Sequence, residues 1–164
     1  TNCSPCRTTR NNTSAPVERT LQLLEGWNLF ALPVLPAPDT RIDDLLADVI
    51  VGPVWRWNAY LGRFETARRA VSKSAYWAYA LTDANVTVTG QPVLNAHVSV
   101  QPGWTLVGPG VDGVAVSNEA VGPVFWRWHA SAGIYLPVKD GVVLDDVAYW
   151  IFADEETLLE FEAP

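Results

Sequence analysis

The feature that most constrains this chain is a tryptophan-rich stretch that occurs twice. Residues 51–58 read VGPVWRWN, and residues 121–129 read VGPVFWRWH. A recurrence of this kind indicates an internal duplication, which has to be recognised before a fold is assigned. We place the two copies at residues 21–93 and 94–164, and all eight Trp fall into equivalent pairs. These pairs are Trp27 with Trp104, Trp55 with Trp126, Trp57 with Trp128, and Trp77 with Trp150.

The pairing of the Trp residues bears on their role. A ligand site tends to be kept in one copy of a duplication and to drift in the other, whereas a core residue is required by both copies. We therefore interpret the Trp set as mainly structural, because a buried aromatic ring removes roughly 150–250 Å² from water. The alternative is that the Trp residues form a pair of aromatic platforms for sugar rings.

Short apolar runs separated by turn residues predict a mainly β fold. Turn signals come about every eight to twelve residues, which is typical of a sandwich or barrel. We expect two pseudo-symmetric β repeats, sandwich-like or barrel-like, that pack about a pseudo-two-fold axis as one domain, with neither repeat closing a core alone. The predicted strands are residues 21–24, 29–35, 54–58, 76–81, 86–89, 98–100, 104–108, 124–129, 134–138, 148–153 and 158–162.

One short helix is predicted at about residues 40–50. Its apolar residues recur at helical spacing, and two acidic residues stand in its first turn, where the helix dipole favours them. Asp39 or Thr40 is the expected N-cap. The corresponding residues of the second copy are poorer in helix formers, so we expect only a turn there. The apolar positions of the predicted helix are Ile42, Leu45, Leu46 and Val49.

Residues 1–20 show no hydrophobic period and predict an extended, flexible, polar N-terminal arm. The arm contains Cys3 and Cys6, the only cysteines. Haem attachment needs His after the second cysteine, where Arg7 stands, and a structural zinc site needs four ligands. A disulfide within the arm or between chains remains, with two free thiols as the alternative.

The charge and the apolar runs exclude two classes of partner. The net charge of −7 argues against nucleic acid, and no apolar run reaches the eighteen or so residues that a membrane helix needs. The chain contains no Met, so we expect a processed or excised segment, and the lack of a signal peptide says nothing about secretion. The N-terminal residues are basic and the last residues acidic, which indicates either two solvated ends or head-to-tail attraction between subunits.

A search for catalytic residues finds little. The only histidines are His97 and His129, and His129 occupies the place of Asn58, which favours a role in capping a turn. No nucleophile elbow, P-loop, zinc-protease motif or dinucleotide fingerprint is present. We expect no enzymatic activity and no cofactor.

One set of acidic residues could hold a metal ion. Asp140, Asp145 and Asp146 are the best candidates for Ca²⁺, which prefers oxygen ligands. The alternative is an acidic, solvated turn.

Four further residues are binding candidates. Trp27 and Tyr60 are possible platforms for a ligand, and Tyr60 is the more informative because its equivalent is Ser131, so no shared core requirement explains it. Arg56 and Arg127 stand between Trp residues on their strands, and for Arg56, which points to the opposite face, we expect a cation–π contact with a neighbouring ring.

The order of motifs resembles a known repeat. It runs from Gly-Trp-Asn-Leu-x-x-Leu-Pro at residues 26–33 through a short helix and Val-Trp-x-Trp-Asn to Ala-Tyr-Trp at residues 75–77. This is similar to a tandem, non-catalytic β repeat of secreted bacterial and archaeal cell-surface proteins, and the resemblance covers nearly all of residues 21–164. It implies an extracellular or cell-surface location and no particular ligand. The second copy departs from the pattern at residues 108–110, which read Gly-Pro-Gly.

These observations lead to two hypotheses for the function. The first is a non-enzymatic extracellular structural or interaction module that binds other protein chains, including copies of itself, through the arm and exposed β edges. Contacts of that kind that do not close would build a filament. The alternative is a carbohydrate-binding module that uses exposed aromatic side chains to bind a glycan.

Overall fold

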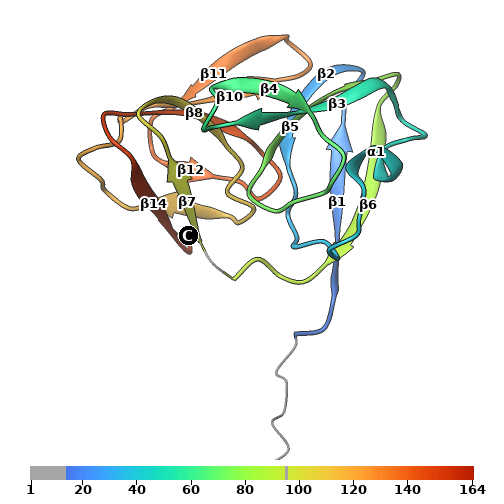
Figure 1. Ribbon diagram of the computed structural model, residues 1–164, viewed down its shortest axis with the longest axis horizontal. Helices are drawn as coiled ribbons and strands as arrows, with labels where there is room; N and C mark the ends of the chain where they lie inside the picture. Colours follow the sequence, from blue (N-terminus) through green and yellow to red (C-terminus); the bar gives the residue numbers. More distant parts are fainter. Residues whose placement is uncertain (1–13, 95) are drawn as a thin grey trace, which may run out of the picture.

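The computed structural model describes residues 14–94 and 96–164 and has a mainly β fold with one short helix, as the sequence predicts. The two repeats lie side by side, one running from blue to green and the other from yellow to red in Figure 1. The strands are β1 (Val17–Leu23), β2 (Gly26–Ala31), β3 (Ile50–Asn58), β4 (Arg63–Thr66), β5 (Ala75–Ala80), β6 (Ala84–Gly90), β7 (His97–Val100), β8 (Gly103–Val107), β9 (Gly113–Ala115), β10 (Phe125–His129), β11 (Ile134–Val138), β12 (Val142–Val143), β13 (Tyr149–Ala153) and β14 (Thr157–Glu162).

Each repeat is built from two antiparallel sheets with matching strand orders. The first repeat has a four-stranded sheet in the order β2-β5-β3-β4 and a two-stranded sheet of β1 and β6. The second repeats this as β8-β13-β10-β11 and β7-β14, and the smaller sheet gains β9 and β12 beside β14. None of the four sheets closes into a barrel within the described residues, so each keeps two edge strands.

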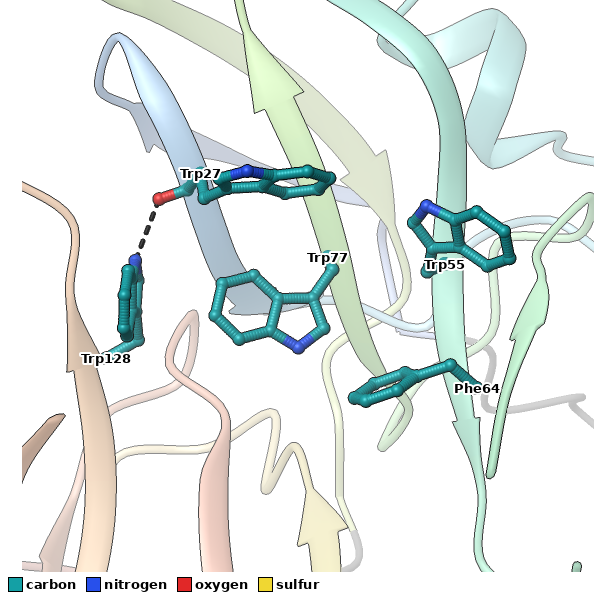
Figure 2. A pocket seen from close by; sticks show the side chains of 5 residues that line it. All are labelled: Trp27, Trp55, Phe64, Trp77 and Trp128. Atoms are coloured by element: carbon teal, nitrogen blue, oxygen red, sulfur yellow. Dashed lines mark hydrogen bonds between the residues drawn. The ribbon is translucent and has the colours of Figure 1, made fainter. Parts of the chain in front are cut away.

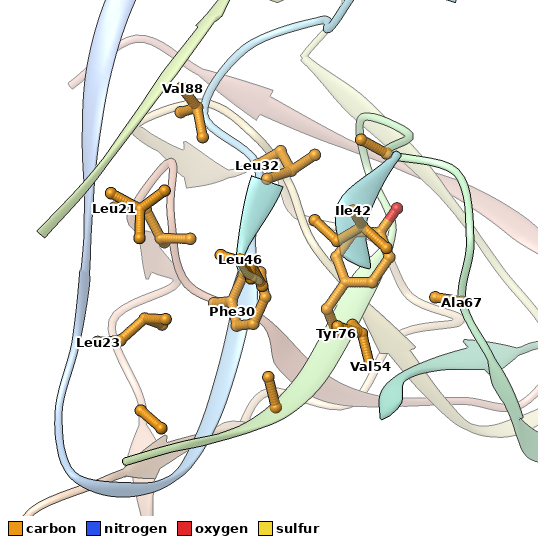
Figure 3. Close-up of a cluster of buried hydrophobic side chains, with 14 of the residues drawn as sticks. Leu21, Leu23, Phe30, Leu32, Ile42, Leu46, Val54, Ala67, Tyr76 and Val88 are labelled. Carbon is orange, nitrogen blue, oxygen red and sulfur yellow. The ribbon is translucent and has the colours of Figure 1, made fainter. Parts of the chain in front are cut away.

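Each repeat has its own hydrophobic core, which corrects the expectation that neither repeat closes one alone. In the first repeat, buried side chains such as Leu21 and Phe30 pack around Tyr76 between the two sheets (Figure 3). The second repeat packs around the equivalent Tyr149. The tyrosine hydroxyls accept backbone N–H bonds, from Val71 at 2.8 Å and from Leu144 at 2.9 Å, so neither buried oxygen lacks a partner.

A third buried cluster joins the two repeats, and every member has its repeat equivalent in the same cluster. Trp77 meets Trp128 with ring centroids 5.2 Å apart at 70°, and Trp57 meets Trp150 at 4.9 Å and 75°. Exchanging the repeats turns the first contact into the second, which is what a two-fold relation between them produces. The cluster consists of Leu29 and Leu106, Ala75 and Ala148, Trp57 and Trp128, and Trp77 and Trp150.

Trp57, Trp77, Trp128 and Trp150 have the predicted structural role, but they pack at the joint and not in the core of either repeat. Side chains alternate along a strand, so on β5 Tyr76 faces the core of its repeat while Trp77 faces the joint. The core face carries aliphatic residues together with Phe and Tyr, and the opposite face carries the indoles. Trp27 and Trp104 remain 46% and 51% exposed.

Two local predictions are also corrected. The arm ends before residue 20, because β1 begins at Val17. This strand pairs antiparallel with β6, with Val17 opposite Gly90 and Leu23 opposite Ala84. The helix α1 covers only Ile42–Leu45, and its N-cap is Arg41, which makes no side-chain cap hydrogen bond. The helix cannot extend to residue 50 as predicted, because Ile50 pairs with Ala80 as the start of β3.

Within the described residues, no helix has the length and the apolar character needed to cross a bilayer. Cys3 and Cys6 lie outside these residues, as does most of the predicted arm.

A close approach of the repeats explains the glycine at position 108. A Cβ atom at this position would lie 2.4 Å from Cβ of Ala31, the equivalent residue of the first repeat, and 2.7 Å from the Ser74 carbonyl oxygen. Both distances are far below van der Waals contact, so only glycine fits here.

We predict that Gly108→Ala destabilises the fold by about 1–3 kcal/mol, because the added methyl group overpacks the joint. Ala31→Gly should restore part of this loss, since Ser74 still blocks the site. Urea unfolding of the two single variants and the double variant measures the coupling energy between positions 31 and 108. If the changes in the free energy of unfolding simply add in the double variant, the predicted contact between these positions is contradicted. Gly122→Ala is the matched control, because its added Cβ meets its nearest atom at an ordinary 3.5 Å.

Candidate binding cleft

An aromatic cleft opens beside the joint between the repeats. Its volume is about 490 Å³, and its walls are almost entirely apolar. Figure 2 shows the five rings around it. Four come from the four-stranded sheet of the first repeat, and one comes from β10 of the second. The lining residues are Trp27, Trp55, Phe64, Trp77 and Trp128.

The strand register places these rings on one face of the sheet. Trp55 of β3 lies directly opposite Trp77 of β5. Phe64 of β4 lies opposite Trp57, two residues after Trp55 on the same face. Residues directly opposite one another in antiparallel strands share a face, and positions i and i+2 share it too. The aromatic alternation of the sequence is therefore converted into a continuous aromatic surface.

The rings of the cleft meet edge to face. Trp27 contacts Trp77 with centroids 6.2 Å apart at 85°, and it contacts Tyr79 at 5.4 Å and 86°. Such contacts place the positive ring edge against the negative ring face and leave other faces open to a ligand. The Trp128 Nε1–H donates to the backbone oxygen of Trp27 at 2.8 Å, so this polar group is already satisfied.

Among the described residues, no acidic, basic or nucleophilic side chain lines the aromatic cleft. The cleft offers ring faces and indole N–H groups, and the ring faces suit flat, apolar groups. Of the four binding residues predicted from the sequence, the structure places only Trp27 in it. Sequence reasoning missed Trp55, Phe64, Trp77 and Trp128 as one surface, although the spacing of Trp55 and Trp57 indicates that they share a face.

The other predicted binding residues lie elsewhere. Tyr60 stands in the turn between β3 and β4, is 84% exposed and lines a separate groove with Lys73. Arg56 lies across from Tyr76 on the core side of the sheet and forms an ion pair with Glu65 at 3.7 Å, in place of the expected cation–π contact.

Arg127 lines a third cavity, together with His129 and Asp146. The Nε atom of Arg127 is buried and has no hydrogen-bond partner within the described residues. Burial raises the pKa of Asp146, and the nearby Arg127 guanidinium opposes this shift.

The structure does not assemble the predicted Ca²⁺ ligands into a metal site. No group of three His, Cys, Asp or Glu side chains suited to a metal forms within residues 14–94 and 96–164. Asp140 instead accepts the backbone N–H of Val142 at 3.1 Å in a turn that contains Gly141. Asp145 has its pKa raised by burial and further by the carboxylates of Asp112 and Asp146.

The turn-capping role of His129 is confirmed. Its Nδ1 accepts the backbone N–H of Ala132 at 3.3 Å, and in the equivalent turn the Asn58 side-chain oxygen accepts the N–H of Leu61 at 3.0 Å. Both hairpins need the left-handed conformation just beyond, where Gly62 has φ 59° and Gly133 has φ 64°.

Comparison of the chain with protein-family models, curated proteins and solved structures found no match. The resemblance to the Gly-Trp and Tyr-Trp repeat therefore stays a prediction, and the function has to be argued from the site itself.

The equivalent residues Trp128 and Trp57 differ in hydrogen bonding, which predicts unequal effects of matched substitutions. Trp128→Phe removes the bond to Trp27, whereas Trp57→Phe removes an indole N–H that is buried with no partner within the described residues. We expect Trp128→Phe to be more destabilising by about 1 kcal/mol. Chemical unfolding of both variants measures this difference, and equal losses would show that the hydrogen bond contributes nothing.

The raised pKa of Asp145 predicts a pH-dependent effect on stability. Its folded-state pKa lies above the unfolded value, so the wild type loses stability as the pH rises through the folded pKa. Asp145→Asn should therefore be more stable than the wild type at pH 7. The difference should vanish near about pH 3, where the carboxyl is neutral in both states. Thermal unfolding at a series of pH values tests this, and a variant less stable at pH 7 would contradict it.

Proposed function

We propose that this chain is a non-enzymatic interaction module that binds an extended, proline-rich segment of a protein chain in the aromatic cleft. The observation that supports this proposal is the set of five rings from both repeats around one apolar cleft. Aromatic-lined grooves are the common docking surface for polyproline II segments. Proline is flat and apolar and has no N–H, so no backbone donor of a proline is left without a partner in such a cleft.

A sugar fits the aromatic cleft less well. Its hydroxyl groups need donors and acceptors, and the side chains that line the cleft offer only indole N–H groups, of which that of Trp128 is already bonded to Trp27. An unpaired polar group that is buried costs about 1–3 kcal/mol. A polyproline II segment is already ordered before it binds, so its entropic cost is small.

The chain carries a segment of this kind itself. Residues 35–39 read Leu-Pro-Ala-Pro-Asp, and Leu35, Ala37 and Pro38 are exposed. The backbone of Leu35 is paired with Gln91 in both directions at 2.8 Å, which holds the segment at the surface. A second copy is therefore the first partner to test, and such head-to-tail contacts would extend into a filament.

The setting that we propose is extracellular or at the cell surface, on the basis of the resemblance of the repeat. The open sheet edges and the N-terminal residues that include Cys3 and Cys6 are proposed as further contacts between chains. In this setting a disulfide would be stable.

We predict that a decaproline peptide binds the wild-type chain and that Trp27→Ala weakens binding at least tenfold, as expected for a central Trp. Trp104→Ala is the matched control. Trp104 is equally exposed and packs on Phe152 at 5.4 Å, as Trp27 packs on Tyr79, but it does not line the aromatic cleft. Isothermal titration calorimetry and Trp fluorescence report binding, with a Gly-Ser peptide of equal length as the negative ligand.

Several outcomes would overturn this proposal. These are an absence of decaproline binding, equal losses in the two Trp variants, and binding of a neutral polysaccharide that depends on Trp27, which would favour the carbohydrate alternative. Sedimentation velocity then tests the second copy as the natural partner. Self-association should be lost in both Trp27→Ala and a Pro36→Ala/Pro38→Ala variant, and loss in neither would point to a different partner chain.

A further inference from the structure

A second groove crosses the joint between the repeats, away from the aromatic cleft. It has a volume of about 340 Å³, and we name it the Lys73 groove. Its walls come from the β3–β4 turn and the segment before β5 in the first repeat, and from β7, β8 and β14 in the second. Unlike the aromatic cleft, it mixes rings with polar groups. The residues that matter here are Trp57, Tyr60, Lys73, His97, Ser99 and Thr105.

The duplication supplies a comparison for the Lys73 groove. A cavity of about 210 Å³, the Asp146 groove, is lined largely by the equivalent positions on the other side of the joint, with Arg127 and His129 in addition. The floors of the two grooves match, since Trp128 and Leu29 stand where the Lys73 groove has Trp57 and Leu106. The joint requires these residues in both copies.

The rims of the two grooves differ. Lys73 is replaced by Asp146, which reverses the charge, and Tyr60 is replaced by Ser131, which removes the ring. The first repeat folds with Lys and Tyr at these two positions, and the second repeat folds with Asp and Ser. The packing of the repeats therefore does not account for Lys73 and Tyr60.

Lys73 has a backbone conformation that its side chain disfavours. Its φ is 62°, and no other non-glycine residue of the described chain has a positive φ. Residues with a Cβ adopt this region at an energetic cost, and such costs concentrate at functional sites. Burial also lowers the pKa of Lys73.

The charge around Lys73 is not balanced. None of the ion pairs among the described residues includes Lys73, and no carboxylate lines its groove. Tyr60 is 84% exposed above the same groove, and Ser99 and His97 supply polar groups on the opposite wall. A ring face, one cation and several hydrogen-bonding groups therefore surround one cavity.

We infer that the Lys73 groove binds an acidic sugar, a uronic acid unit of an anionic polysaccharide. The sugar ring stacks on Tyr60, its carboxylate pairs with the Lys73 ammonium, and its hydroxyl groups bond the polar wall. The chain as a whole has a net charge of −7, so it repels an anion everywhere except where a local cation attracts it. This inference concerns a surface distinct from the aromatic cleft and does not rest on the proposed function.

The test is calorimetric titration with a galacturonic acid hexamer, compared with maltohexaose as a neutral oligomer of equal length. We expect the acidic hexamer to bind, with affinity falling as salt rises, and the neutral one to bind at least tenfold more weakly. Lys73→Gly should abolish binding of the acidic hexamer. It should also keep or raise the folding stability, because glycine adopts the required φ without strain.

Matched variants separate this site from general charge effects. Lys139→Ala removes the only other lysine, which is exposed and does not line the groove, and should leave binding unchanged. Tyr60→Phe should keep binding and Tyr60→Ala should weaken it, whereas Trp27→Ala should have no effect. The inference is overturned by an acidic hexamer that does not bind, by equal binding of the neutral hexamer, or by equal losses in Lys73→Gly and Lys139→Ala.

Discussion

The structure depends on the edge-to-face contacts of four indoles at the joint between the repeats. The ring centroids of Trp77 and Trp128 lie 5.2 Å apart, and those of Trp57 and Trp150 lie 4.9 Å apart. Each contact joins one ring of the first repeat to one ring of the second. Each repeat has its own core, but the four-stranded sheets expose an aromatic face that water disfavours. Covering part of these faces reciprocally brings the repeats together, and it leaves the remaining rings around an open cleft.

A duplicated chain separates what the fold requires from what it does not. Positions that both copies need stay alike, as the buried Tyr76 and Tyr149 do, each with its hydroxyl bonded to the backbone. Positions on the rims of the grooves have diverged in size and charge. The divergence makes the two sides of one joint chemically different, which gives a symmetric scaffold two unlike surfaces without a change in its packing.

The two candidate binding surfaces, the aromatic cleft and the Lys73 groove, differ in polarity. The aromatic cleft has rings and no charged side chain, so it suits an apolar chain, whereas the Lys73 groove combines a ring, a cation and polar groups. Both lie at the joint, and the wall of the Lys73 groove also carries His97 and Ser99. One scaffold therefore presents an apolar and a polar surface beside the same set of indoles.

Local sequence pattern determined the β class, the duplication, most strands and the glycine turns, because alternation and turn chemistry act over a few residues. It also identified the role of His129, since that role lies within one hairpin. Only the tertiary structure decided that the Trp residues form a joint and a cleft, because a period of two shows that residues share a face but not what that face meets. The short helix was predicted from the sequence, but its extent was not, since Ile50 pairs with Ala80 and so begins β3 within the predicted helical range.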